Sequence, residues 1–262
     1  MNIPTIGGTR GIFEIFVPGV FLLINIGVAV YLFPYIDAET KGILVSVSSN
    51  SALALVVAIC FGYLIGVLLR LIRADVPDQL SAAWLRRFER GARKEKGGFK
   101  LYATEEFPYF GWIEEAAQRY LPPEASEFYS RTWAKRKTGH RSKQFFNFCK
   151  LIVASCDEKA ANEVYAAEAL TRYIAGMFYA LTLAVILLLV TLILRYIAVG
   201  QLMSGLVFVL AIYLLAILVI IQYFRGIRIK EVETVFAATF RNKAAFEEAG
   251  LEGETVTTGQ AG

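Results

Sequence analysis

Residues 173–194 read YIAGMFYALTLAVILLLVTLIL, a stretch without a single charged side chain. A helix needs about 20 consecutive apolar residues to cross the hydrocarbon core of a bilayer, and this stretch is long enough. Three more stretches meet the same requirement, at residues 18–36, 52–69 and 206–224. The sequence therefore predicts an all-α, polytopic membrane protein with four transmembrane helices.

The composition predicts aqueous parts beside these spans. Of the 262 residues, 56% are hydrophobic and 19% are charged. This is too apolar for an ordinary soluble domain and too charged for a chain that lies wholly in lipid. The three cysteines are odd in number and lack the spacing of a metal knuckle, so they predict free thiols in a reducing compartment.

The spans are spaced as two pairs. Short links join the first span to the second and the third to the fourth, whereas residues 71–171 separate the pairs. This spacing predicts two transmembrane hairpins with a helical cytoplasmic domain between them. The predicted parts are an N-terminal interfacial arm (1–17), transmembrane hairpin 1 (18–70), the cytoplasmic helical domain (71–171), transmembrane hairpin 2 (172–225), a cytoplasmic helical extension (226–249) and a disordered tail (250–262).

Lysine and arginine set the predicted orientation. Each short link holds one such residue, Lys41 or Arg195, whereas many flank the opposite ends of the spans. Basic flanks stay on the cytoplasmic side of a membrane. The sequence therefore predicts a multi-pass protein of the cell inner (plasma) membrane, with both termini and residues 71–171 in the cytoplasm.

Two helices are predicted to continue beyond their spans. Asp157 resembles an N-cap, and the residues after it run without a helix breaker into the third span. The fourth span continues into residues 225–249, where apolar side chains recur at intervals of three and four. This periodicity predicts an amphipathic face that packs on another part of the protein.

Pro18 marks the predicted start of the first span. A proline has no amide hydrogen for the carbonyl of Glu14, and it fits well as the first residue of a helix. Residues 10–17 are then expected to form a separate amphipathic arm at the membrane surface, with Glu14 paired to Arg10. In the alternative interpretation, Glu14 lies at the entrance of a pore, because acids near the membrane core are commonly functional.

Small residues recur every four positions along two of the spans. Such stripes let helix backbones approach closely in lipid. They predict close helix packing, either inside one chain or between subunits. The residues are Ala54, Ala58, Gly62 and Gly66 in the second span and Gly176, Ala180 and Ala184 in the third.

Polar residues in and beside the spans are few. No span carries an acid, a base or a histidine at mid-depth, which argues against a proton-coupled transporter. The serine-rich stretch at residues 46–51 could line the outer mouth of a pore, or it could be a solvated loop that enters the second span. The candidate pore or vestibule residues are Glu14, Asn25, Ser48 and Asn50.

A basic segment at residues 131–150 holds seven lysines and arginines, no acid, and several aromatic residues. It predicts contact with anionic lipid headgroups or with an anionic ligand. The net charge of the chain is only +4, which argues against nucleic acid as a partner. The candidate contact residues are Arg131, Lys135, Arg136, Lys137, Arg141 and Lys143.

Catalytic chemistry is not predicted. His140 is the only histidine, and no set of nucleophile, base and orienting group is recognisable, so neither an enzyme nor a metal or cofactor site is expected. The leading hypothesis is a homo-oligomeric channel or membrane-permeabilising pore gated by its cytoplasmic domain, with anionic lipids as surroundings. The alternative is a membrane-anchored scaffold or sensor subunit that recruits a soluble cytoplasmic protein.

Overall fold

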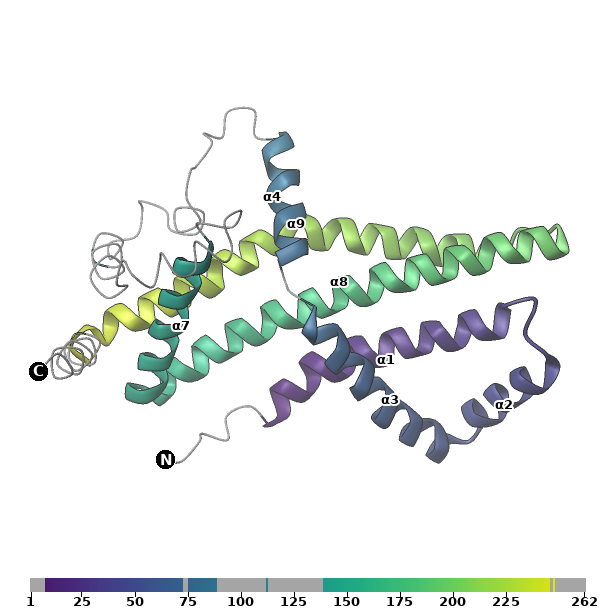
Figure 1. The fold of residues 1–262 in the computed structure, drawn as a ribbon, viewed down its shortest axis with the longest axis horizontal. Coiled ribbons are helices and arrows are strands. Elements are labelled where there is room, and N and C mark those ends of the chain that lie inside the picture. Colours follow the sequence, from purple (N-terminus) through teal and green to yellow (C-terminus); the bar gives the residue numbers. More distant parts are fainter. Residues whose placement is uncertain (1–7, 73–74, 89–111, 113–138, 246, 248–262) are drawn as a thin grey trace, which may run out of the picture. The chain divides into compact units, whose positions relative to one another are not determined.

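A computed structural model describes residues 8–72, 75–88, 112, 139–245 and 247. Over these ranges the chain is all-α and contains no strand. The helices are α1 (Gly8–Leu32), α2 (Ala38–Ser49), α3 (Ser51–Leu71), α4 (Asp75–Phe88), α7 (Gly139–Cys156), α8 (Glu158–Val199) and α9 (Ser204–Arg241), as labelled in Figure 1.

Four of these helices are long and apolar enough to cross a membrane. The apolar segments begin at Glu14 in α1 and at Ser51 in α3, and the other two belong to α8 and α9. The predicted number of helices that could span a membrane is therefore confirmed. The first helix ends at Leu32, before the predicted end of its span at residue 36. Pro34 follows closely, and the residue before a proline is disfavoured in the α conformation.

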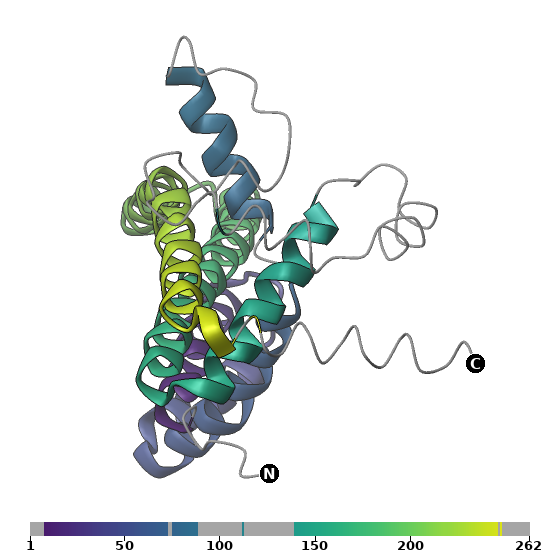
Figure 2. The same ribbon diagram turned by 90° about the vertical axis from the view of Figure 1, so that its left-hand side faces the viewer.

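The described residues belong to two compact units. The first unit contains α1, α2, α3 and α4 with the Ala169–Arg225 region of the chain, which holds the apolar parts of α8 and α9. The second unit contains α7, the first residues of α8 and the last part of α9. Two helices therefore contribute to both units, and each keeps one unbroken helical course (Figure 1 and Figure 2).

The continuation of two helices beyond their spans is confirmed. Helix α8 has 42 residues and α9 has 38. Asp157 precedes α8, and its Oδ1 accepts a hydrogen bond from the amide of Ala160 at 2.9 Å, as an N-cap does.

The predicted helix boundary at Pro18 is wrong. Helix α1 starts at Gly8 and passes through Pro18 without interruption. Pro18 is buried, and a β-carbon added to Gly176 of α8 would lie 3.1 Å from its Cγ. The ring packs where α8 has no side chain, and such packing by neighbouring helices makes proline tolerable inside a membrane helix.

The segment between the first two spans contains a helix in place of the predicted loop. Asp37 caps the start of α2, because its Oδ2 accepts from the amide of Thr40 at 2.8 Å. Asn50 separates α2 from α3, and its Oδ1 accepts from the amide of Leu53 at 3.2 Å. These two caps satisfy amides that a helix start leaves without partners, which explains helix formation in a serine-rich stretch.

The core of the first unit is formed between helices. One group of apolar side chains joins α1 and α3 to α8, with Leu22, Leu69, Ala180 and Ala184 buried. A second group joins α1 to both long helices, with Ala29, Leu188, Leu192, Leu206 and Leu210 buried. Helix α4 is tied to α9, because the backbone amide of Arg225 donates to Oγ of Ser81 at 3.2 Å.

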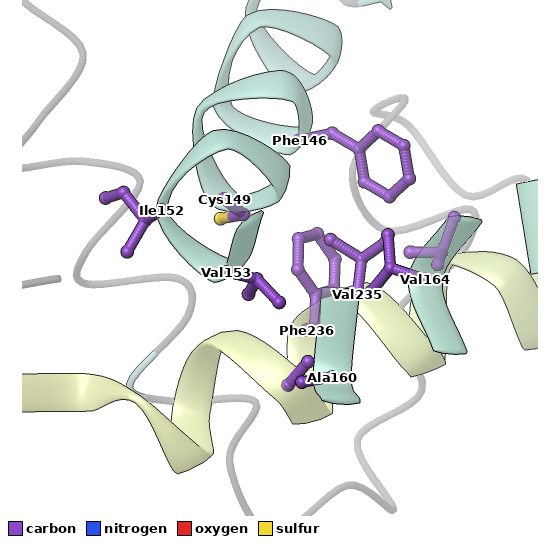
Figure 3. Close-up of a cluster of buried hydrophobic side chains, with 10 residues drawn as sticks. Phe146, Cys149, Ile152, Val153, Ala160, Val164, Val235 and Phe236 are labelled. Carbon is purple, nitrogen blue, oxygen red and sulfur yellow. The ribbon is translucent and has the colours of Figure 1, made fainter. Parts of the chain in front are cut away.

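The core of the second unit lies between α7, α8 and α9 (Figure 3). Cys149 and Val153 of α7, and Val235 of α9, are completely buried there. The rings of Phe146 and Phe236 meet edge to face, with centroids 6.0 Å apart. The amphipathic face predicted beyond the fourth span therefore packs on α7 and α8.

Candidate functional site

A polar contact inside the first unit joins α1 to α9. Asn25 is 4% exposed, and its Nδ2 donates to the carbonyl of Phe21 at 2.8 Å. The hydroxyl of Tyr213 donates to Oδ1 of Asn25 at 3.1 Å, and the rings of Phe21 and Tyr213 are 5.3 Å apart. A polar side chain in an apolar segment needs such partners. Asn25 therefore serves the contact between two helices of one chain.

The threonines of the third span are also satisfied inside their helix. The hydroxyl of Thr182 donates to the carbonyl of Phe178 at 2.7 Å, and that of Thr191 donates to the carbonyl of Leu187 at 2.9 Å. These bonds remove the cost of a hydroxyl in an apolar environment.

The four candidate pore residues do not form one site in a single chain. Glu14 lies half-buried on α1, 11 residues before Asn25, which corresponds to about 16 Å along a helix. Ser48 is exposed on α2 and donates to the carbonyl of Val45 at 2.9 Å. Asn50 is the residue between α2 and α3 and caps the start of α3.

The small residues of the second and third spans lie against helices of the same chain. A β-carbon on Gly62 would lie 2.5 Å from Cγ2 of Val20, and one on Gly66 would lie 1.9 Å from the carbonyl oxygen of Ile15. Gly19 is the counterpart on α1, since a β-carbon there would lie 1.8 Å from the carbonyl oxygen of Gly62. The backbones of α1 and α3 are therefore in direct contact.

The remaining members of the two stripes differ in burial. Ala180 and Ala184 of α8 are completely buried in the first unit, whereas Ala54 and Ala58 of α3 are only half-buried. Sequence reasoning missed the role of Gly19. The available signal was a small residue in the first span, one of the two spans without a recognised stripe.

The basic segment is largely outside the described residues. Arg131, Lys135, Arg136 and Lys137 lie beyond them. Helix α7 includes Arg141 and Lys143, but their side chains are also outside the described part. Contact with anionic lipid or ligand through this segment stays a prediction.

A group of four charged side chains around Phe146 was not predicted, and we call it the charged cluster. Lys150 of α7 forms an ion pair with Glu168 of α8, and Arg228 pairs with Glu231 of α9 at 2.6 Å. Nζ of Lys150 lies 5.4 Å from the centroid of the Phe146 ring, and Cζ of Arg228 lies 5.9 Å from it. The Phe146 ring therefore makes cation–π contacts with side chains from two helices.

The charged cluster is shielded from water to different degrees. The side chain of Glu231 is 2% exposed, those of Glu168 and Lys150 are 14% and 15% exposed, and that of Arg228 is 32% exposed. A buried carboxylate is costly unless a cation accompanies it. The two acids and two bases of the charged cluster carry equal and opposite formal charge.

The charged cluster lies where two helices leave the second unit. Glu168 is the last residue that α8 contributes to this unit, and Arg228 is near the first that α9 contributes. Lys150 and Glu168 are 18 positions apart, on different helices. No periodic pattern connects such residues, which is why the sequence alone did not predict the pairing.

A second polar junction joins the end of α9 to the start of α8. Arg241 faces Glu163 at 3.6 Å, and the pKa of Asp157 lies below its ordinary value. The main cause is the hydrogen bond from the amide of Ala160, and Asn242 and Arg241 lower the pKa further. This junction holds the N-cap of α8 in its charged form.

The described residues hold no group of three or more histidine, cysteine or acidic side chains that could bind a metal ion. The free cysteines are Cys60, Cys149 and Cys156. No protein-family model, no curated protein and no solved structure matches the chain.

Proposed function

We propose that the chain assembles into a homo-oligomeric channel or membrane-permeabilising pore, gated by its cytoplasmic part. The observation that carries this proposal is the unbroken course of α8 and α9, which extend from the charged cluster into apolar segments. A helix moves as a rigid element, so a displacement at one end is transmitted to the other.

The charged cluster could hold the helices of the second unit in one arrangement until a ligand or partner separates the pairs. It joins α7 to α8 through Lys150 and Glu168, and the shared Phe146 ring connects this pair to Arg228 of α9. A ligand or partner that separated Lys150 from Glu168 would have to supply new opposite charges for these poorly exposed side chains. Such an arrangement favours two discrete states over gradual loosening.

The uncovered apolar surface of α9 and α3 is available for contacts with lipid or with other subunits. Only 11% of the apolar window of α9 and 17% of that of α3 are buried within one chain. Large side chains such as Phe208 and Leu215 are 67% and 62% exposed. Asn25 and the threonines of α8 already have partners inside the chain, so a pore is better formed between several chains than within one.

The proposed setting is the inner (plasma) membrane, with anionic lipids and both termini in the cytoplasm. The distribution of lysine and arginine along the sequence supports this orientation. Glu14 would then lie near the cytoplasmic entrance. One acid in each subunit would form a ring, and rings of acids favour cations.

A second candidate function is a membrane-anchored scaffold that recruits a soluble protein. The observation in its favour is exposed apolar surface on the second unit, where Leu151 is 70% exposed and Tyr165 is 40% exposed. A partner could cover these side chains.

Flux into lipid vesicles distinguishes the two functions. Purified protein is reconstituted into vesicles that contain an ion-sensitive dye, and the dye signal is compared with that of empty vesicles. The channel proposal predicts ion entry that increases with the amount of protein. A scaffold produces the same signal as empty vesicles, and that result would reject the channel.

A further inference from the structure

We propose that α2 is an interfacial helix that lies in the headgroup region of the bilayer and contacts lipid through Ile43, Leu44 and Val47. None of its residues is buried within the chain. Ile43 is 60% exposed although it belongs to an ordered helix. An apolar side chain left uncovered by its own protein needs another apolar environment.

The position of α2 along the chain holds it at the membrane surface. The apolar segment of α1 ends at Leu32, and α2 begins at Ala38. Asn50 alone separates the end of α2 from the apolar segment that starts at Ser51, and consecutive Cα atoms are about 3.8 Å apart. If α1 and α3 cross the membrane, both ends of α2 are attached to residues at its boundary.

The bend at Asn50 keeps α2 from extending α3 into water. Asn50 has an extended backbone, with φ −91° and ψ 102°, so the two helices do not share one axis (Figure 1). Helix α2 also contacts both α1 and α3. This arrangement is typical of a helix that runs along the surface and not of one that projects from it.

The two faces of α2 differ in chemistry. Ile43, Leu44 and Val47 are grouped at helical spacing on one face. The opposite face carries Gly42 and Ser49, seven positions apart and both exposed, with Val45 as its one large apolar side chain. An apolar face of this kind enters the region between headgroups and acyl chains, while the face of Gly42 and Ser49 stays in water.

The charge of this segment indicates how it would bind. Asp37 and Glu39 are acidic and Lys41 is basic, so attraction to anionic lipid does not hold α2 at the surface. We therefore expect apolar contact with neutral lipid that salt does not weaken. The inference depends on α1 and α3 crossing the membrane and not on conduction, so a vesicle without ion flux would leave it intact.

Depth-dependent quenching of a fluorescent probe tests the inference. The full chain carries Cys60→Ser and Cys156→Ser, and one cysteine is introduced by Ile43→Cys or, as the matched control on the opposite face, by Ser49→Cys. Both positions are exposed, so neither change removes a buried contact. Each variant is labelled with an environment-sensitive fluorophore and reconstituted into phosphatidylcholine vesicles. The parent with only Cys149 measures background labelling.

We expect the probe at position 43 to emit at shorter wavelength and to be quenched several-fold more by a nitroxide on the lipid acyl chain than by aqueous iodide. The probe at position 49 should show the reverse preference, and high salt should change neither. Equal quenching of both probes by iodide would overturn the proposal, since α2 would then lie in water. Protection of position 43 from both quenchers would also overturn it, because a second copy of the chain would then cover this face. Val47→Cys, on the apolar face, repeats the test if Ile43→Cys fails to fold.

Discussion

Gly19 permits the contact on which the packing of α1 against α3 depends. A β-carbon at this position would lie 1.8 Å from the carbonyl oxygen of Gly62 and 2.6 Å from the backbone nitrogen of Gly66. Backbone atoms cannot rotate away as a flexible side chain can, so the helices would have to separate. Close approach through small residues is the main way in which helices associate where lipid removes the hydrophobic driving force.

We expect Gly19→Ala to destabilise the first unit by about 1–3 kcal/mol, as overpacking of a tight contact does. Gly27→Ala is the matched control on the same helix, because nothing lies within 4 Å of a β-carbon there. The control gains helix propensity of up to about 1 kcal/mol without a clash. Thermal unfolding in mild detergent measures both variants, and equal midpoints would contradict the backbone contact.

Cys149 is protected by its burial in the second unit. Burial raises the pKa of its thiol from 9.0 to about 12, and the side chain of Thr239 only partly opposes this effect. Since the thiolate is the reactive form, a maleimide at about pH 8 should modify Cys156 and leave Cys149 unmodified. Mass spectrometry of a Cys60→Ser variant measures this order, and modification of Cys149 at the rate of Cys156 would contradict the packing in Figure 3.

The same pKa shift predicts a dependence of stability on pH. The folded chain keeps the Cys149 proton up to about pH 12, whereas an unfolded chain would release it near 9.0. The stabilisation is therefore complete below about pH 9 and is lost as the pH rises towards 12. Cys149→Ala removes this contribution, so alkaline unfolding of the second unit should become less steep in that variant.

At the scale of helices, α7 is attached to α8 by the pair of Lys150 and Glu168. Both side chains are about 15% exposed, so water screens the attraction poorly. Lys243 and Glu247 form a contrasting pair on one exposed surface, 3.6 Å apart and 47% and 43% exposed. Pairs of the second kind contribute little to stability.

We expect Lys150→Ala to loosen α7, at a cost of about 2 kcal/mol for removing one partner of a poorly exposed pair. Hydrogen–deuterium exchange of residues 146–156 should become faster, since the amides open more readily. Lys243→Ala is the control and should leave this exchange unchanged. The double change Lys150→Glu with Glu168→Lys should restore protection. An unaltered exchange rate in Lys150→Ala would show that the pair does not hold α7 in place.

Local patterns predicted some elements and tertiary contacts decided others. The four apolar segments and the N-cap at Asp157 depend on neighbouring residues, so the sequence was sufficient to predict them. The passage of α1 through Pro18 depends on Gly176 of another helix. Helix α2 has caps at both ends, Asp37 and Asn50, which stabilise a helix despite its serine-rich composition. The charged cluster joins residues distant in sequence, which no periodicity connects.

At the scale of the whole molecule, the distribution of lysine and arginine predicts the orientation in the membrane. Reporter fusions after Lys41 and after Gln201 should be detected outside the cell. Fusions after Gly97, which lies outside the described residues, and at the C-terminus should be detected inside. A cytoplasmic signal after Lys41 would reverse the orientation, and the proposed position of Glu14 at the cytoplasmic entrance would be wrong.

The central claim is that the charged cluster controls a pathway through the membrane, and vesicle flux in three proteins tests it most directly. The wild type, Lys150→Glu, and the pair Lys150→Glu with Glu168→Lys are reconstituted at equal protein amounts. Lys150→Glu places an acid opposite Glu168, so α7 should separate from α8. We expect measurable flux from the wild type, several-fold higher flux from the single variant, and wild-type flux from the double variant. Flux no greater than that of empty vesicles in all three would contradict the account.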